Sequence, residues 1–418
     1  MKNYSRLLEP VKFPNGATAN NRMMMAAMND FGANLDGSIS DDQVNYLSQR
    51  SQVAGMIVTG YAYVSEVGKQ SPTQISATEN ADMGGLRRLA RAGKQHGAKV
   101  IMQLSHAGHS AVAAQMDGMT PVAASELHVP WLTYDLHELT ETEVEEVIAD
   151  FGQATRRAIE AGFDGIELHA CNHDLIQQFF SPSTNFRTDY WGGDFEKRSR
   201  FPLAVLDEVI RVVKELDRPD FIIGYRISPE EVHGSEVSFT YQDTLKLIAA
   251  IADRDVDYLN ISLAGTPYHY DSVPRGFTHG THATVAAAKI DHKIPIFTGN
   301  FVTNADEALD AVKYSDGVYL GRAALMEPEF AKKIADGNAN DIVETMSLDR
   351  MRVVDFPKGL IATYQDPSGM GGHEVFPGFT ANEKPGYFYE YLASRPDGNA
   401  ENSQKYLKLV QGLSESIK

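Results

Sequence analysis

The sequence predicts an α/β fold, a single (β/α)8 TIM barrel followed by a C-terminal extension. Three observations favour it. Short apolar runs rich in β-branched residues alternate with longer segments of helical spacing, and about eight such units fit within the 418 residues. No G-x-G-x-x-G motif follows the first apolar run, whereas a doubly wound open sheet usually begins with that turn and has fewer strands.

Eight segments have the length and composition of buried parallel strands. In chain order they are 22–28, 55–63, 99–106, 165–170, 221–228, 258–262, 295–301 and 317–322. Segments with helical spacing lie between them. These are 41–52, 84–96, 141–161, 196–216, 241–254, 284–291, 305–313 and 328–336.

Two regions interrupt the alternation. Residues 108–140 form a long segment after the third strand, and from about residue 347 onward the chain carries Gly and Pro clusters, including 367–372. Long loops on a barrel usually line or cover its active face. We therefore predict a barrel over residues 1–345 and an extension over 346–418 that packs on the barrel or on a neighbouring subunit.

The charge balance, the cysteine content and the N-terminal residues exclude several classes of function. The 38 basic and 56 acidic residues give a formal charge of −18, which repels phosphate backbones and anionic lipid, so we expect neither a nucleic-acid nor a membrane partner. Cys171 is the one cysteine, so no intrachain disulfide or cysteine-ligated cluster is possible, and no metal site is predicted. Because residues 1–10 lack the apolar core of a signal peptide, we expect a cytoplasmic enzyme.

The fourth strand ends in a candidate catalytic pair. Alternation along 165–170 directs His169 toward the barrel axis, and Asn172 follows three residues later. Two neighbouring donors can hold a developing oxyanion. The alternative is that His169 is a hydrogen-bonded structural histidine.

The third and fifth strands each carry a polar residue among apolar neighbours. Gln103 needs partners there, which a flat heterocycle with carbonyls and ring N–H groups would supply; the alternative is a polar layer inside the barrel. Arg226 lies between isoleucines, where a cation requires an anion or dense hydrogen bonding. Its alternative partner is Glu167, in a salt bridge inside the barrel.

The seventh and eighth strands end in glycine, followed by a polar residue. The loops after these strands are the usual phosphate site of a barrel, glycines let backbone N–H groups approach a ligand, and arginine adds a charged donor. Two ordinary turns are the alternative. The predicted phosphate site comprises Gly299, Asn300, Gly321 and Arg322.

At these residues the chain resembles the Old Yellow Enzyme family of FMN-dependent ene-reductases, from about residue 7 to about residue 328. The most specific motifs are FDGIELHACN at 163–172, QFFSP at 178–182 and NFRTDYWGGDFEKRSRF at 185–201. Supporting matches are NR at 21–22, AAM at 26–28, VTG at 58–60, QLSHAG at 103–108 and GR at 321–322.

The resemblance implies FMN as cofactor, NADH or NADPH as electron donor, a small-molecule substrate, and a homo-oligomer as a possible assembly. His169 and Asn172 would hydrogen-bond a substrate carbonyl, with His169 also contacting the flavin. Gln103 would bind the pyrimidine edge and Arg226 the N1 and O2 edge. The ring would be lined by Ala26, Ala27, Met28, Asn29 and Gly60, and the phosphate held by Gly299, Asn300, Gly321 and Arg322.

The chain departs from the family pattern at three places. Asp174 occupies the position of the usual proton-donor tyrosine. Burial could raise its pKa and make it an acid; otherwise solvent, Tyr61 or Tyr63 must supply the proton. Asn29 stands where some members have Cys or Thr, and the pair at 26–27 is Ala-Ala where Ala-Pro or Ser-Pro is common.

Three alternative functions follow. The dienoyl-CoA reductase branch is excluded as a full architecture by the single cysteine and by the absence of a C-terminal Rossmann pattern. A flavin-free lyase or isomerase acting on a phosphorylated substrate would need a Schiff-base lysine or a metal cluster at the strand ends, and neither is found. A flavin-binding barrel with weak or different reductase activity is favoured by Asp174.

Overall fold

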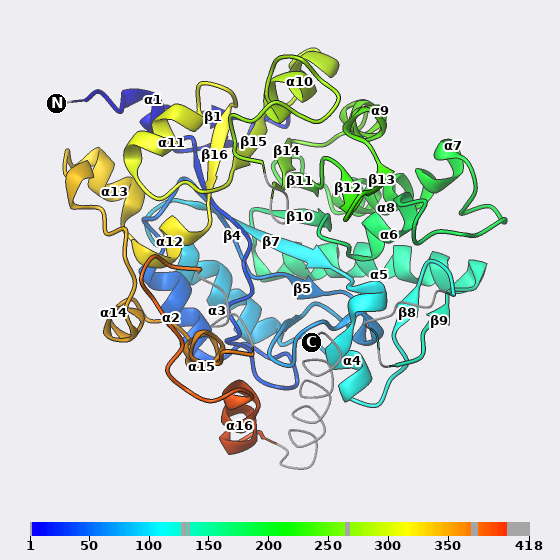
Figure 1. Cartoon of the computed structure of the whole chain (residues 1–418), viewed down its shortest axis with the longest axis horizontal. Helices are drawn as coiled ribbons and strands as arrows, with labels where there is room; N and C mark the ends of the chain where they lie inside the picture. Colours follow the sequence, from blue (N-terminus) through cyan, green and yellow to red (C-terminus); the bar gives the residue numbers. More distant parts are fainter. Residues whose placement is uncertain (1, 127–131, 133, 264–267, 369–374, 399–418) are drawn as a thin grey trace.

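The computed structural model describes residues 2–126, 132, 134–263, 268–368 and 375–398 and confirms the predicted barrel (Figure 1). Eight strands pair in parallel in the order β3-β4-β7-β10-β11-β14-β15-β16, and β16 pairs with β3 to close the ring. The barrel strands are β3 (Met23–Met25), β4 (Met56–Val58), β7 (Lys99–Ser105), β10 (Gly165–Ala170), β11 (Ile222–Ile227), β14 (Tyr258–Ile261), β15 (Ile296–Gly299) and β16 (Gly317–Leu320).

The predicted second strand is divided into two. Val58 of β4 pairs with Ile101, whereas Ala62 of β5 (Ala62–Tyr63) pairs with Leu104. Between these two pairs the β4–β5 segment advances four residues while β7 advances three, as in a β-bulge. The extra residue interrupts the ladder just before Tyr61, whose side chain lines the main cavity.

Helices surround the barrel between successive strands, as predicted. The segment expected as one helix over 196–216 is instead two, because the chain breaks at Ser199 between α7 (Phe195–Arg198) and α8. The helices that cover the barrel are α2 (Asp41–Gln49), α3 (Met83–Gly93), α5 (Glu141–Ala161), α8 (Arg200–Glu215), α9 (Tyr241–Ala252), α10 (His282–Lys289), α11 (Ala305–Ala311) and α13 (Phe330–Ala335).

Shorter elements fill the connections. They are α1 (Ser5–Leu8), β1 (Val11–Lys12), β2 (Thr18–Ala19), η1 (Glu66–Gly68), β6 (Ile75–Ser76), η2 (Gly108–Ser110), α4 (Val112–Met116), β8 (Val122–Ala123), β9 (His137–Glu138), α6 (Leu175–Phe180), β12 (Glu231–His233), β13 (Glu236–Phe239), α12 (Arg322–Met326) and η3 (Ala339–Asp341).

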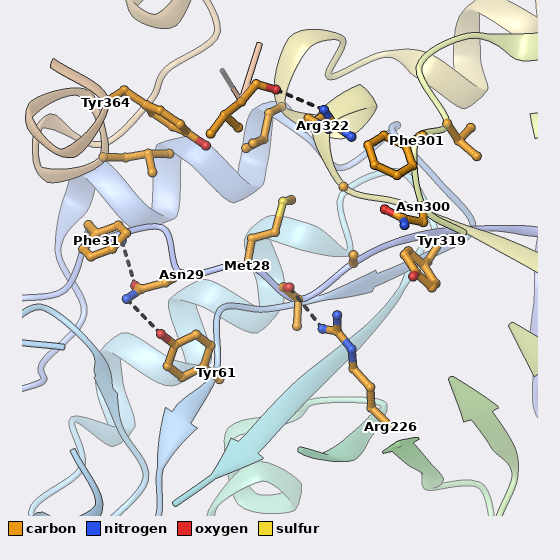
Figure 2. A pocket seen from close by; sticks show the side chains of 17 residues that line it. Met28, Asn29, Phe31, Tyr61, Arg226, Asn300, Phe301, Tyr319, Arg322 and Tyr364 are labelled. Atoms are coloured by element: carbon orange, nitrogen blue, oxygen red, sulfur yellow. Dashed lines mark hydrogen bonds between the residues drawn. The ribbon is translucent and has the colours of Figure 1, made fainter. Parts of the chain in front are cut away.

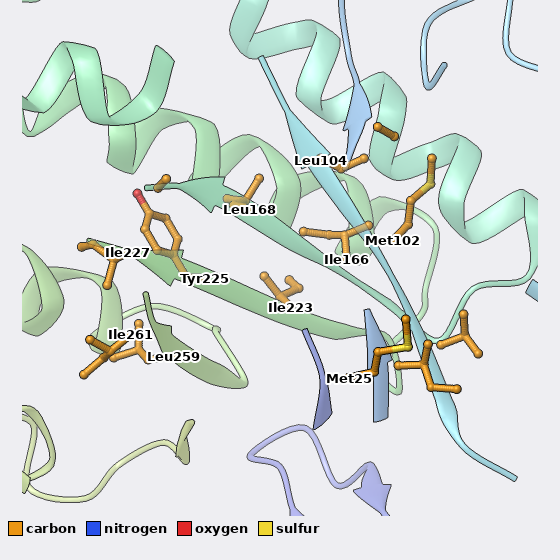
Figure 3. Packing of buried hydrophobic residues seen from close by; sticks show 14 of the residues in the cluster. Met25, Met102, Leu104, Ile166, Leu168, Ile223, Tyr225, Ile227, Leu259 and Ile261 are labelled. Carbon is orange, nitrogen blue, oxygen red and sulfur yellow. The ribbon is translucent and has the colours of Figure 1, made fainter. Parts of the chain in front are cut away.

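The apolar residues form two main layers. Outward-facing strand side chains such as Met102, Ile166 and Ile223 pack beneath the surrounding helices (Figure 3). Inward-facing residues form a second cluster inside the barrel. At its N-terminal end Phe13, from the β1–β2 hairpin, lies against Tyr258 with ring centroids 6.0 Å apart, so the hairpin closes this end.

Three helices of the predicted extension lie against the barrel: α14 (Leu348–Val353), α15 (Lys358–Gln365) and α16 (Tyr387–Ser394). Arg50 of the barrel is fully buried and donates to the carbonyl oxygens of Leu325 and Val354, which ties the extension to it. Residues 369–374 and 399–418 of the predicted extension lie outside the described residues. A contact with a neighbouring subunit stays a prediction. Within the described segments, no helix combines the length and apolar composition of a membrane span.

Candidate active site

A cavity of about 450 Å³ lies where the barrel strands end at their carboxyl termini, which is where barrel enzymes place their active sites (Figure 2). Eight predicted cofactor residues line it: Ala26, Ala27, Met28, Asn29, Arg226, Asn300, Gly321 and Arg322. The same wall therefore holds residues from both ends of the predicted site, the ring end and the phosphate end.

Two predicted glycines lie outside the cavity wall. A Cβ on Gly60 would lie 3.0 Å from the carbonyl oxygen of Met28, so glycine lets that backbone come close. A Cβ on Gly299 would lie 2.5 Å from the carbonyl oxygen of Tyr319, so glycine there is required for the pairing of β15 with β16.

Other cavity residues were not predicted. Tyr319 points inward from β16, and strand alternation could have indicated it. Leu360, Tyr364 and Val375 come from the extension, whose sequence has no barrel-like period that could place them. The extension thus supplies one wall of the cavity. The remaining unpredicted lining residues are Phe31, Phe301, Val302 and Leu325, and Tyr61, considered as a proton donor, also lines the cavity.

Arg226 is a buried cation with weak internal partners. Its guanidinium donates to the carbonyl oxygen of Ala27 at 3.4 Å and to Ser262 Oγ at 3.2 Å, and its Nε has no hydrogen-bond partner. Among the described residues it forms no ion pair. A buried cation in this state matches an incoming anionic ligand.

The alternative salt bridge between Arg226 and Glu167 is not formed, because three neutral donors occupy the Glu167 carboxylate. These are Gln103 Nε2 at 2.6 Å, Tyr258 Oη at 3.1 Å and Asn260 Nδ2 at 3.1 Å. Glu167 also fixes the amide of Gln103, whose buried Oε1 is left without a partner.

These unpartnered atoms fit FMN. Gln103 offers an acceptor for a ring N–H, and Arg226 offers donors for a carbonyl and an electron-rich ring nitrogen. At the other end of the cavity, the Arg322 guanidinium lies 4.9 Å from the Phe301 ring centroid and donates to the carbonyl oxygen of Val375 at 3.3 Å. Its remaining donors are suited to a phosphate.

His169 and Asp174 form a buried pair next to this cavity. His169 Nδ1 lies 2.5 Å from Asp174 Oδ2, and both residues are at most 6% exposed. Burial alone would lower the pKa of His169, but the coulombic effects of Cys171 and Asp174 and the hydrogen bond to Asp174 outweigh it and raise the pKa to about 10. His169 is therefore an imidazolium at neutral pH.

The same pair determines what His169 presents to a ligand. With Nδ1–H donated to Asp174, the imidazolium has one remaining donor, Nε2, which lies 3.4 Å from Asn172 Nδ2. Two donors cannot satisfy each other, so both remain available to a shared acceptor. Asn172 Oδ1 accepts from Ser262 Oγ at 3.3 Å, and this contact fixes the amide orientation.

Of the two tyrosines considered as proton donors, the structure brings Tyr61 to the site. Its ring is stacked on that of His169 with centroids 5.8 Å apart and planes 8° apart. Its hydroxyl accepts from Asn29 Nδ2 at 3.3 Å, as Figure 2 shows. Burial and the charge of Asp174 raise the pKa of Tyr61, so its phenol keeps its proton. Tyr63 is buried outside the cavity wall.

Known proteins are similar to this chain in sequence and in fold. A model of the "NADH:flavin oxidoreductase / NADH oxidase family" matches residues 6–341. The probable NADH-dependent flavin oxidoreductase YqiG of Bacillus subtilis (strain 168) is 37% identical over 341 residues, which are 81% of this chain and 90% of that protein. The NADH:fumarate oxidoreductase of Klebsiella pneumoniae (strain 342) is 35% identical over 81% of this chain, but over 36% of its own length.

A solved structure supports the same architecture. The Old Yellow Enzyme homologue from Zymomonas mobilis superposes with a TM-score of 0.70 at 24% identity and covers 84% of this chain and 99% of that one. The family model and the sequence relative show the family, and the solved structure shows the shared fold. The chain belongs to the NADH:flavin oxidoreductase / NADH oxidase family, the Old Yellow Enzyme family, and is an FMN-dependent oxidoreductase with NADH or NADPH as electron donor.

Proposed function

We propose that the chain is an ene-reductase that reduces the activated C=C bond of small enones or related electrophiles. The observation that carries this proposal is the placement of His169 Nε2 and Asn172 Nδ2, which lie 3.4 Å apart beside Tyr61, a residue of the cavity wall. Bound FMN, once reduced by the nicotinamide donor, supplies a hydride from N5.

The two donors would act on the substrate carbonyl. As the β-carbon gains hydride, negative charge grows on the carbonyl oxygen, and donors aimed at that oxygen stabilise it more than they stabilise the ground state. A cationic His169 is a stronger donor than a neutral one. Asp174 then serves as a positioning residue that holds His169 in its charged form.

We assign the proton for the α-carbon to Tyr61. Asp174 is turned to His169 at 2.5 Å and does not line the cavity, so its carboxylate is engaged. Tyr61 lines the cavity, lies over the His169 ring and remains protonated. Its position after the bulge between β4 and β5 directs it inward.

The test is an anaerobic half-reaction. The purified yellow protein is reduced with NADH or NADPH and then mixed with 2-cyclohexenone while flavin absorbance is followed. We expect the enone to accelerate reoxidation, and His169→Ala to slow it by about 100-fold or more without loss of bound FMN. Ferricyanide is the matched control, because it needs no carbonyl contact and should oxidise both proteins equally.

A second candidate function is NADH oxidation with an acceptor other than a C=C bond. The engaged Asp174 leaves the usual proton-donor position without an available acid, which favours a barrel that oxidises NADH and passes electrons to an acceptor needing no carbon protonation. In that case cyclohexenone would not accelerate reoxidation, whereas a quinone or oxygen would. Equal enone rates in the parent and in His169→Ala would contradict the proposed role of His169.

A further inference from the structure

A second cluster of ligating side chains lies at the rim of the barrel, outside the cavity. His173 belongs to the loop after β10, and Glu231 and His233 belong to β12. One ligand atom from each lies within 4.8 Å of the others, and this is the one group of its kind in the described part of the chain.

Distances within the cluster are close to those of a metal centre. Glu231 Oε1 lies 3.0 Å from His233 Nε2, and Glu231 Oε2 lies 3.7 Å from His173 Nδ1. In a tetrahedral zinc site with bonds of about 2.0–2.1 Å, neighbouring ligand atoms are about 3.3 Å apart. These two separations, one to each oxygen of Glu231, bracket this value. With one ligand atom taken from each residue, all three lie within 4.8 Å of one another, so binding an ion would draw them closer together.

The Glu231 carboxylate, which lies between the two histidines, is fixed by hydrogen bonds from residues on its buried side. The Glu231 side chain is 1% exposed, and Gln177 Nε2 donates to its Oε2 at 2.6 Å while Ser181 Oγ donates to its Oε1 at 2.7 Å. Both histidine side chains are more than 40% exposed, so solvent reaches the open side of the cluster. Fixed ligands with outer-shell donors and one open side are the arrangement of His2Glu metal sites.

A third histidine lies nearby. His109 is buried, its Nδ1 has no hydrogen-bond partner within the described segments, and it is close enough to His173, Glu231 and His233 to interact with them electrostatically. His109 is therefore a neighbour of the cluster and not one of its three proposed ligands.

We propose that His173, Glu231 and His233 form a binding site for a divalent transition-metal ion, with water completing the coordination. The ligand set suits Zn²⁺, and also Co²⁺ as a spectroscopic substitute. Such an ion would join the β12–β13 hairpin to the loop that carries Asn172 and Asp174, one residue on either side of His173. The site is independent of FMN and of the proposed reaction.

The experiment is a calorimetric titration with ZnCl2 of the FMN-loaded, chelator-treated full chain without a polyhistidine tag. We expect one saturable site per chain, and at least about tenfold weaker binding in His173→Ala and in His233→Ala. Both residues are exposed, so both variants should fold. His137→Ala is the matched control, because exposed His137 contacts Glu143 at 2.9 Å but has no third ligand.

A Co²⁺ titration gives a second readout. The parent chain should develop ligand-field absorption bands that His233→Ala lacks and His137→Ala retains. The proposal is overturned if the parent chain shows no saturable Zn²⁺ binding, or if His137→Ala weakens binding as much as His233→Ala does.

Discussion

The two ends of the barrel are built in opposite ways. At the N-terminal end, Phe13 packs on Tyr258. Asn15 donates through Nδ2 to the carbonyl oxygen of Phe221 and through its backbone N–H to Asp257 Oδ1. At the C-terminal end, Arg226 Nε and Gln103 Oε1 are buried and have no hydrogen-bond partner among the described residues. One end is complete by itself, and the other is complete only with a ligand.

This difference separates stability from function. Apolar side chains at the closed end stabilise the fold in every state of the enzyme. An unpaired polar atom at the open end costs about 1–3 kcal/mol until a ligand pairs with it. Substitutions at the closed end should therefore change the free energy of unfolding, whereas substitutions at the open end should change ligand binding.

The largest effect is expected at the closed end. Phe13→Ala removes a nearly buried ring and should lower the free energy of unfolding by about 4 kcal/mol. FMN affinity of the folded fraction should not change. Urea unfolding and flavin fluorescence titration measure the two quantities, and a large loss of FMN affinity would break the proposed division.

Arg226→Met should have the reverse effect at the open end. We expect FMN affinity to fall by more than about 100-fold, roughly 3 kcal/mol, because the cofactor loses its charged partner. The flavin-free protein should be as stable as the parent or more stable, since a buried unpaired charge is removed. Clear destabilisation of the flavin-free variant would show that Arg226 has a structural partner instead.

Asp174→Asn keeps the side-chain shape but removes its charge. The charge of Asp174 is one of the effects that raise the pKa of His169, so that pKa should fall in the variant, and binding of a phenolate ligand at pH 8 should weaken by roughly thirtyfold, about 2 kcal/mol. Absorbance titration with a substituted phenol measures it. Unchanged affinity at pH 8 would refute the positioning role.

The same pair predicts how stability depends on pH. The pKa of His169 is about 10 in the folded chain and 6.5 as its ordinary value, so its contribution is present below pH 6.5 and is lost as pH rises toward 10. The parent chain should therefore lose more of its free energy of unfolding between pH 6.5 and 9.5 than Asp174→Asn does. Parallel urea curves at the two pH values give the comparison.

The smallest effect is expected at the phosphate end. Arg322 is only partly buried, so Arg322→Met should weaken FMN binding by about fivefold, roughly 1 kcal/mol, and less at high salt. Riboflavin, which lacks the phosphate, is the matched control and should bind both proteins equally. An equal loss for riboflavin would assign Arg322 to the ring.

Sequence reasoning succeeded where a local pattern has one structural solution. The eight strands were predicted because buried parallel strands leave continuous apolar runs. Four cavity residues, Arg226, Asn300, Gly321 and Arg322, followed from their places in strands or directly after them, whereas Ala26, Ala27, Met28 and Asn29 followed from the family resemblance. The break at Ser199 was missed, because residues 196–200 are all polar and contain no Gly or Pro that would mark a helix end. The bulge before Tyr61 was missed because a single extra residue does not alter composition.

Contacts between distant segments could not be predicted. His173 and Glu231 are 58 positions apart, and no period relates them, so their proximity depends on the path of the hairpin β12–β13. Asp174 was recognised as unusual from the sequence, but its hydrogen bond to His169 depends on the turn into α6. Leu360 and Tyr364 reach the cavity through tertiary packing alone.

The wall contributed by Leu360, Tyr364 and Val375 has a consequence for how the enzyme is made. During translation, the ribosome synthesises the eight strands before these residues, so the cavity of a nascent barrel lacks one wall. We therefore expect a chain that ends before these residues to hold flavin less tightly than the full polypeptide does.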